Sequence, residues 1–143
     1  MQKVFTISGF SDEITPVLTE QFEALNKLGI CYYEPRGVDG ENISHISDDK
    51  IKDVKEKMDK YGIKVSSIGS PIGKIKITDD FEPHFEAYKR TVEIAKALNS
   101  KYIRLFSFYI PSDEDKKQYR DEVMRRLKMF ADYAKEQEII ILH

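Results

Sequence analysis

The feature that most constrains the fold is a regular alternation of short β-forming segments with amphipathic helices. After one such segment near the N-terminus, four more follow at spacings of 33, 39 and 37 residues, beginning at Ile30, Ile63, Tyr102 and Ile139. Between them, apolar residues recur at the spacing of a helical face. Strands that alternate with helices in this way form a parallel sheet through crossover units. The sequence therefore predicts a single α/β domain over residues 1–143.

The boundaries of the expected elements follow from this pattern and from local end signals. Predicted strands cover residues 4–8, 30–34, 63–68, 101–106 and 139–142, and predicted helices cover residues 16–28, 48–61, 85–98 and 115–137. Ser47 is expected to cap the second helix and Gly62 to end it. The last strand, Ile139–Leu142, is four branched aliphatic residues in a row, so we expect it to be buried on both faces.

Two architectures share this order of elements. One is an open, five-stranded flavodoxin-like sheet. The other is the N-terminal portion, about four and a half (β/α) units, of a TIM barrel, which typically needs about 250 residues. The longer loops, residues 69–80 and 108–114, follow strands, whereas the turns from helix to strand are short. This asymmetry favours the barrel, and both architectures place their sites at the C-terminal ends of the strands.

Composition excludes several classes of protein. The 23 basic and 25 acidic side chains give a net charge of -2. A nucleic-acid-binding protein is expected to have an excess of basic residues instead. No apolar run is long enough to span a membrane, and no secretory signal is visible, so the cytoplasm is expected. Cys31 is the one cysteine, which excludes an internal disulfide. It lies in an apolar segment, and we expect it to be a small core residue.

Polar residues with possible chemistry follow the predicted strands. Glu34 and Arg36 are two apart, so in an extended chain they point the same way and could bind a polyol or carbonyl substrate. A mutual ion pair is the alternative. The loop Gly69–Lys74 contains Ser70 and could cradle a phosphate through backbone N–H groups. Its spacing does not match a P-loop, so a plain turn is the alternative.

The fourth and fifth strands carry further candidates. Arg104 lies among aliphatic residues and is either buried and paired or part of a site, and the Ser107 hydroxyl follows it. His143 ends the last strand, where an imidazole suits acid–base catalysis or metal binding, the alternative being a terminal residue without a role. His45 and His84 are expected to face solvent. With no pair of histidines at helical spacing, no complete metal site is predicted.

Four short motifs occur in order on successive predicted strands. They are Gly9-Phe10-Ser11-Asp12-Glu13, Tyr33-Glu34-Pro35-Arg36-Gly37-Val38, Gly69-Ser70-Pro71-Ile72-Gly73-Lys74 and Arg104-Leu105-Phe106-Ser107-Phe108-Tyr109. Together they resemble the sugar phosphate isomerase/epimerase family, whose members are xylose isomerase-like (β/α)₈ barrels. The resemblance covers the whole chain but only the first half of a family member.

The resemblance implies a divalent metal, such as Mn²⁺, Mg²⁺, Co²⁺ or Zn²⁺, in the complete barrel. The metal polarises a sugar-like substrate while carboxylates move a proton next to a carbonyl. In relatives the first metal ligand follows a Leu-His pair at the end of the fifth strand, so no metal ligand is expected up to His143. The resemblance leaves Glu34 and His143 as catalytic candidates. The substrate-binding candidates are Arg36, Ser70, Arg104 and Ser107.

The chain is thus expected to be the N-terminal half of a metal-dependent sugar (phosphate) isomerase or epimerase that acts by proton transfer next to a carbonyl, and to be itself inactive and without a bound metal. A non-catalytic half-barrel and a small α/β binding module are alternatives. Endonuclease IV-type repair enzymes share the superfamily, but they carry histidines where this chain has residues 8–11, Ser-Gly-Phe-Ser. The expected partner is a small sugar or polyol, with no nucleic acid or membrane. Open sheet edges predict a homo-oligomer.

Overall fold

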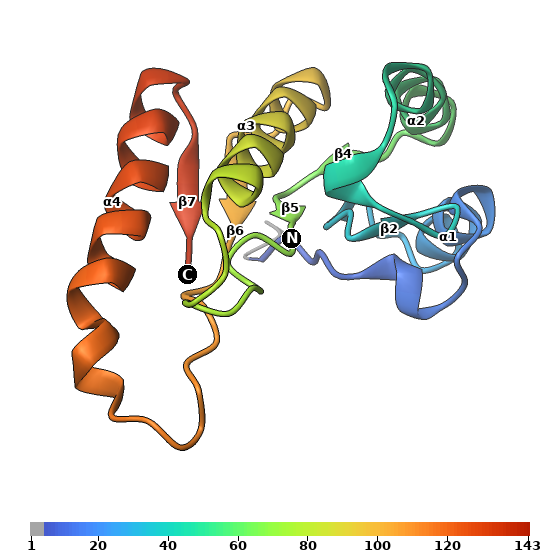
Figure 1. The fold of residues 1–143 in the computed structure, drawn as a ribbon. Coiled ribbons are helices and arrows are strands. Elements are labelled where there is room, and N and C mark those ends of the chain that lie inside the picture. The colour runs from blue at the N-terminus through green and yellow to red at the C-terminus, as the bar shows by residue number, and fades with distance from the viewer. Residues whose placement is uncertain (1–4) are drawn as a thin grey trace.

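The computed structural model describes residues 5–143, which form an α/β fold (Figure 1). The helices are α1 (Leu18–Lys27), α2 (Asp48–Tyr61), α3 (Glu82–Ala97) and α4 (Arg120–Glu136). The strands are β1 (Tyr32–Tyr33), β2 (Gly37–Val38), β3 (Glu41–Asn42), β4 (Lys64–Val65), β5 (Ile68–Gly69), β6 (Tyr102–Arg104) and β7 (Ile140–Leu142). Three short 3₁₀ turns accompany them, η1 (Ser11–Glu13), η2 (Ile43–His45) and η3 (Lys116–Tyr119). None of the described helices is long and apolar enough to cross a bilayer.

The strand order follows the chain order, as in a barrel. Strand β1 pairs in parallel with β4, and β5 pairs with β6, which pairs with β7. Strands β4 and β5 are the two ends of the predicted strand 63–68, so this segment joins both groups. In Figure 1 the helices follow one another along one side of the strands, whereas a flavodoxin-like sheet is covered on both faces. The predicted parallel α/β fold is confirmed, with the barrel order rather than the open alternative.

The second helix begins and ends where the sequence predicts. The Ser47 hydroxyl accepts a hydrogen bond from the Lys50 backbone N–H at 3.2 Å. Gly62 ends α2 in the left-handed conformation, with φ of +65°, which costs glycine no steric strain. Helix α4 begins later than predicted, because the Asp115 carboxylate first accepts a bond from the Lys117 N–H and starts η3.

A small antiparallel hairpin, β2–β3, replaces the predicted loop after β1. Its turn residues Asp39 and Gly40 have φ angles of +49° and +84°. An Asp-Gly pair adopts such a turn readily, because its twist matches that of the flanking strands. The Asp39 carboxylate also accepts a hydrogen bond from the Leu18 N–H at 2.8 Å. The hairpin therefore fixes the start of α1, which lies two residues beyond the predicted start at Pro16.

The core lies between the helices and the strands and is rich in aromatic rings. The Phe22 ring on α1 meets the Tyr33 ring on β1 edge-on, with centroids 4.9 Å apart. On the next helices, Tyr88 and Phe130 have ring centroids 4.6 Å apart, and the Tyr88 hydroxyl donates to the Phe130 carbonyl oxygen at 3.0 Å. Buried aromatic pairs of this kind add stability beyond area burial. They fix α3 against α4 and α1 against the sheet.

Two predictions near the N-terminal edge are wrong. The described part of the predicted first strand, residues 5–8, forms no strand, and Val4 lies outside the described residues. Its Phe5 and Ile7 side chains are 84% and 66% exposed, so little apolar burial favours a regular strand. Cys31 was expected in the core but is exposed; it lines a cavity beside residues 5–7, which form no strand to cover it.

The last strand, β7, is also less buried than predicted. Ile139 is buried, but Ile140 is 50% and Leu142 is 40% exposed. In the described chain, β7 pairs only with β6, and the register aligns Ile103 with Ile141 on the helix side. Ile140 and Leu142 therefore point to the opposite side. We call this side of the strands, which the helices do not cover, the open face.

We expect the chain to self-associate through the β7 edge, because exposed apolar edge strands pair with other chains. Sedimentation should show a dimer or larger species, and Ile140→Lys should shift the distribution toward monomer. The matched control is Ile14→Lys, since Ile14 is 57% exposed in a turn away from the strand edges. An unmodified chain that sediments as a single monomeric species would contradict this expectation.

Candidate functional site

The ring of Phe10 is the centre of a group of charged side chains on the open face. The guanidinium carbon of Arg36 lies 4.9 Å from the ring centroid, and that of Arg104 lies 5.0 Å from it. Cation–aromatic contacts of this length are attractive. The ring also packs against β5 at Gly69, where a Cβ atom would lie 2.9 Å from Phe10 Cε1. Three segments far apart in sequence therefore meet at one ring.

The contacts continue from Arg104 to a second ring. The Arg104 guanidinium carbon lies 4.8 Å from the centroid of Phe106, and the Lys74 Nζ lies 4.5 Å from the same centroid. We call this row of alternating cations and rings the cation–aromatic ladder; in spatial order its members are Arg36, Phe10, Arg104, Phe106 and Lys74. Its members come from the loops after β1, β5 and β6, from β6 itself and from the segment before η1. The ladder therefore spans the C-terminal ends of the strands.

Arg36 is neutralised by two carboxylates. Its Nε donates to Asp12 Oδ2 at 2.9 Å and its Nη2 donates to Glu13 Oε1 at 3.1 Å. The hydrogen bond to Asp12 is the main reason why the pKa of Arg36 is raised. The sequence left open a mutual ion pair between Glu34 and Arg36, but the structure gives Arg36 other partners. Asp12 and Glu13 orient Arg36 against Phe10.

Arg104 is in a different electrostatic position. Burial lowers the pKa of its guanidinium, and the charge of Glu34 acts in the opposite direction. Among residues 5–143 it forms no ion pair, and its Nε is buried without a hydrogen-bond partner. An unpartnered donor in such a place costs free energy. Arg104 therefore carries a charge that the Glu34 carboxylate influences without a hydrogen bond or ion pair between them.

Ser70 has a positioning role in this structure. Its side chain is fully buried, and its hydroxyl donates to the Arg104 carbonyl oxygen at 2.5 Å while accepting a bond from the Ile72 N–H. The Ser70 carbonyl oxygen accepts from Arg104 Nη2 at 3.1 Å. These bonds orient Arg104 and leave the Ser70 hydroxyl no access to a ligand. Ser107 follows β6, is half-buried and forms no side-chain hydrogen bond within the described part of the chain.

The structure separates His143 from the other predicted site residues. Side chains alternate along β7, and Leu142 shares the open face with Arg104, its partner in register. The His143 side chain instead lines a groove with Met124 on α4 and with Ile141, on the helix side. His143 therefore does not join Glu34 and Arg104 in this structure.

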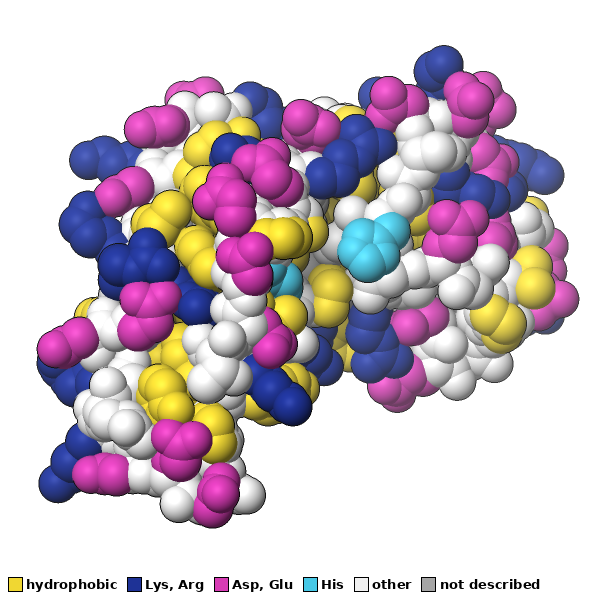
Figure 2. Space-filling model, in the orientation of Figure 1, with side chains coloured by type: hydrophobic (Ala, Val, Ile, Leu, Met, Phe, Trp, Pro, Cys, Tyr) yellow, Lys and Arg dark blue, Asp and Glu magenta, His cyan; other side chains and the backbone are white. Residues whose placement is uncertain are grey.

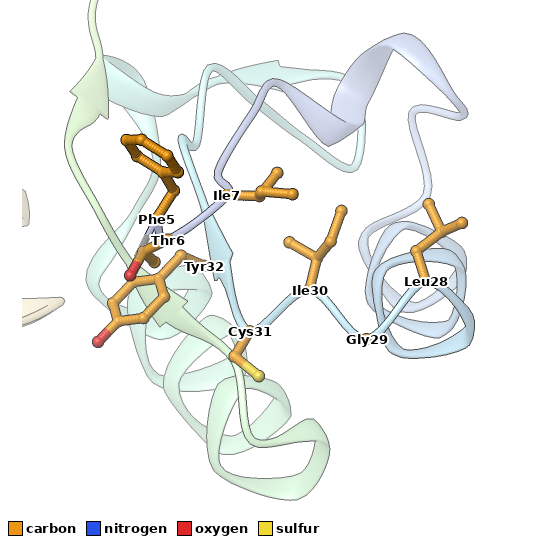
Figure 3. Close-up of a pocket in the computed structure, with 8 residues that line it drawn as sticks. All are labelled: Phe5, Thr6, Ile7, Leu28, Gly29, Ile30, Cys31 and Tyr32. Carbon is orange, nitrogen blue, oxygen red and sulfur yellow. The ribbon is translucent and has the colours of Figure 1, made fainter. Parts of the chain in front are cut away.

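The pocket of about 380 Å³ in Figure 3 lies at the opposite end of β1 from the ladder. Residues 5–7 and 28–32 line it, and the Ile7 and Ile30 side chains point toward each other across it. The Cys31 sulfur points away from Ile30. Among the residues that the structure describes, no charged side chain lines this pocket, so they supply no ionic group to bind a ligand there. The face of the molecule drawn in Figure 2 carries charged side chains of both signs, with hydrophobic side chains between them.

The described residues do not form a metal site on their own. No group of three or more His, Cys, Asp or Glu side chains within residues 5–143 is placed to hold an ion. Near the ladder, Asp12 and Glu13 are already bound to Arg36, which leaves Glu34 as the carboxylate without such a bond. A single carboxylate does not supply the ligand set that a catalytic divalent ion needs.

His84 anchors the loop after β5 through a hydrogen bond. The Gly73 N–H donates to His84 Nε2 at 2.8 Å. Gly73 has φ of +89°, and a Cβ atom there would overlap the Phe106 carbonyl oxygen. Burial lowers the pKa of the half-buried His84, and the nearby charge of Arg126 adds to this effect. His84 was predicted to face solvent; instead its neutral imidazole accepts a bond from the loop.

The family of the chain follows from comparison with known proteins. A family model described as "Xylose isomerase-like TIM barrel" matches residues 22–143. The chain belongs to this family. The match confirms the resemblance that the four sequence motifs indicate. No curated protein matches the chain.

Solved structures share the fold at low sequence identity. One is a xylose isomerase-like TIM barrel protein from Mycobacterium smegmatis in complex with magnesium, with 14% identity and a TM-score of 0.72, covering 95% of this chain and 53% of that one. A D-psicose 3-epimerase has 19% identity and a TM-score of 0.65, with 94% and 50% covered. An AP endonuclease, family 2, from Brucella melitensis has 13% identity and a TM-score of 0.69, with 95% and 53% covered. This chain therefore spans about half the length of these structures.

We expect Gly69→Ala to destabilise the fold by about 1–3 kcal/mol, because a new methyl group displaces the Phe10 ring or the backbone. The added Cβ would also lie 3.2 Å from the Pro35 carbonyl oxygen. Urea unfolding followed by circular dichroism measures the change. Gly9→Ala is the control, since no atom lies within 4 Å of a Cβ at that position. Equal unfolding midpoints for the two variants would contradict the close contact.

We expect the bond between His84 and Gly73 to make stability depend on pH. Because the folded pKa of His84 is lowered, the unfolded chain takes up a proton more readily than the folded chain. The stabilisation is complete above the ordinary pKa of about 6.5 and is lost as the pH falls below that value toward the folded pKa.

Thermal melts between pH 8 and pH 5 test this expectation. His84→Gln, which keeps an acceptor that does not titrate, should lose less stability on acidification than the unmodified chain does. His45→Gln serves as the control, because His45 is exposed. An identical pH dependence for all three proteins would rule out a contribution from His84.

Proposed function

We propose that this chain supplies the substrate-binding wall of a metal-dependent sugar isomerase or epimerase. The observation that carries the proposal is the arrangement of Glu34, Phe10 and Arg104 on the open face, at the C-terminal ends of the strands. Sites of TIM-barrel enzymes lie at this end. A D-psicose 3-epimerase among the structures of the same fold supports the choice of reaction.

Each residue has a role that suits a polyol substrate. The guanidinium group of Arg104, and that of Arg36 beside it, would donate hydrogen bonds to hydroxyl or carbonyl oxygens. The Phe10 ring would pack against the C–H groups of the sugar and exclude water. The Glu34 carboxylate would accept a hydroxyl proton in a hydrogen bond, and it is the one candidate here for moving a proton next to a carbonyl.

Complete turnover would need more than these residues. In the proposed reaction the substrate carbonyl would need the Lewis acidity that a bound divalent metal would supply, and one of the structures of the same fold is a magnesium complex. The described residues of this chain do not form a ligand set for such an ion. We therefore propose that the chain binds the substrate but does not convert it by itself.

A DNA-repair function is the second candidate, because one structure of the same fold is titled an AP endonuclease. Two features of this chain disfavour it. The net charge is -2, and phosphate backbones are bound through clusters of unpaired cations. In addition, Arg36 is already neutralised by Asp12 and Glu13. Binding to a duplex that contains an abasic site would favour this candidate over the sugar isomerase.

We expect the chain to bind simple ketoses weakly and to show no isomerisation or epimerisation with Mn²⁺, Mg²⁺, Co²⁺ or Zn²⁺. Binding is measured by NMR titration, and conversion by chromatography of the sugars. Arg104→Gln and Glu34→Gln should each weaken binding about ten-fold, because each removes a charge-assisted hydrogen bond.

Arg120→Gln is the matched control, because Arg120 is exposed at the start of α4 and remote from the ladder. Affinity that stays the same in all three variants would contradict the assignment of the site. Conversion of a sugar by the unmodified chain would contradict the proposed lack of turnover.

A further inference from the structure

The described chain repeats one arrangement, a helix followed by one position in the row of parallel strands. Helix α1 precedes β1, α2 precedes the segment of β4 and β5, α3 precedes β6, and α4 precedes β7. A TIM barrel closes when eight helices and eight strands form a ring. This chain spans about half the length of a TIM-barrel protein of the same fold. Two copies of the chain therefore supply the helices and strands of one ring.

Helix α4 and β7 form one flank of the molecule, at one end of the row of helices (Figure 1). An apolar groove of about 580 Å³ runs along this flank. Met124, Leu127 and Ala131 of α4 line it together with Ile141 of β7, and the Met124 side chain is exposed. In a closed barrel, the next helix of the ring covers such a groove. Among the described helices, none lies over it.

Helix α1 presents an apolar stripe on the other flank, at the far end of the same row (Figure 1). Val17 and Leu28 at the two ends of the helix are exposed, and Ala24 between them is half-buried. Their spacing places the three side chains on one helical face. The Glu23 carboxylate, in contrast, accepts a bond from the Tyr61 hydroxyl of α2. The stripe therefore lies on the side of α1 that faces away from α2.

The place beside β1 on this second flank is incompletely filled. Residues 5–7 and 30–32 line the pocket of about 380 Å³, and Ile7 and Ile30 face each other across it (Figure 3). Within the described residues, one backbone hydrogen bond joins segments 5–9 and 30–34, from the Glu34 N–H to the Gly9 carbonyl oxygen. A paired parallel strand would form such bonds evenly along its length. Residues 5–7 therefore leave the edge of β1 open to another strand.

Strand β7 has the side chains that this place requires. Ile140 and Leu142 lie on the open face and Ile141 lies on the helix side, so the strand is apolar on both faces. Strands inside a parallel barrel have this character. In the described chain, one edge of β7 pairs with β6 and the other edge has no strand partner. A two-fold axis along the barrel would keep the strands of both copies parallel.

One pair of opposite charges would also meet at the contact between α4 and α1. Lys128 lies twelve residues before the start of β7, and Glu20 lies twelve residues before the start of β1. When the two strands begin at the same level, these side chains are level as well. Lys128 lines the groove, and Glu20 is exposed one helical turn before Ala24 of the stripe. The charges therefore favour α1 of a second copy as the helix that fills the groove.

We propose that two copies of this chain close one eight-stranded ring. In this ring β7 of each copy displaces residues 5–7 and lies beside β1 of the other copy, and α1 of each copy fills the α4–β7 groove of the other. Arg104 lies two strands from Glu34 of its own copy, and the ring places Glu34 of the second copy two strands away on the other side. The second copy thus contributes a carboxylate to the candidate site. The inference does not rest on the proposed function.

Cross-linking through Cys31, the one cysteine of the chain, tests the contact. In the ring the start of β7 lies beside the start of β1, so Ile140→Cys would place a thiol near Cys31 of the second copy. A short bis-maleimide reagent should convert most of the dimer to a covalent form, in which mass spectrometry finds positions 31 and 140 joined. Lys52→Cys is the matched control, because Lys52 is exposed on α2, away from both flanks.

The double variant Cys31→Ser/Ile140→Cys separates the ring from a symmetric dimer. Two β7 strands that pair with each other would still be joined through position 140, because a symmetric contact brings the same residue together from both copies. The ring predicts that the double variant stays largely unlinked. Efficient linking of the double variant would overturn the ring, and so would linking of Lys52→Cys as complete as that of Ile140→Cys.

Sedimentation of charge-reversed chains gives a second test that needs no reagent. Glu20→Lys and Lys128→Glu should each weaken the dimer about ten-fold, because like charges then face each other at both contacts of the ring. Both residues are exposed, so the fold should stay intact. An equimolar mixture of the two variants should recover the affinity, since each contact regains opposite charges. A mixture as weak as the single variants, or an unmodified chain that stays monomeric, would overturn the inference.

Discussion

The contact between the Phe10 ring and the backbone at Gly69 is the interaction on which the open face depends. Gly69 has no side chain, so the ring can lie against β5 and in contact with two guanidinium groups. The ring shields part of both cations from water, and each cation in turn is held by a separate set of bonds. Arg36 relies on the carboxylates of the same N-terminal segment, whereas Arg104 relies on Ser70. Any larger residue at position 69 would disturb both groups at once.

The fold could be predicted because the sequence patterns that indicate its helices and strands lie within each element and its flanking residues. Helix α2 follows directly from its cap at Ser47 and from Gly62, and the order of strands follows from short crossover units. The strand predictions that failed concern segments whose structure depends on contacts with distant parts of the chain. The predicted strand 63–68 is interrupted because its first half pairs with β1 and its second half pairs with β6. Residues 5–8 have β-forming side chains but too little burial to form a strand, and no propensity scale contains that information.

For similar reasons, some residues of the candidate site could be proposed from the sequence and others could not. Glu34, Arg36 and Arg104 could be proposed because charged residues at the ends of buried strands stand out from their neighbours. Phe10 and Asp12 were not assigned as site residues, although they lie in a recognisable motif. An aromatic residue in a loop cannot be assigned to a site from sequence alone, because the cations that contact its ring come from distant segments. The face of His143 could not be inferred, because four consecutive aliphatic residues before it show no alternation from which to count.

The ladder joins positions 10, 36, 74, 104 and 106, so its members are brought together only when segments from most of the chain have docked. Such contacts close long loops and form late, since the entropy of closure must be offset first. A ligand at the ladder would thus bind the folded chain and ignore the unfolded one, so that occupancy and folding are thermodynamically linked. For a chain with an exposed apolar strand such as β7, the concentration of such a ligand would then help to determine how much of the protein stays folded.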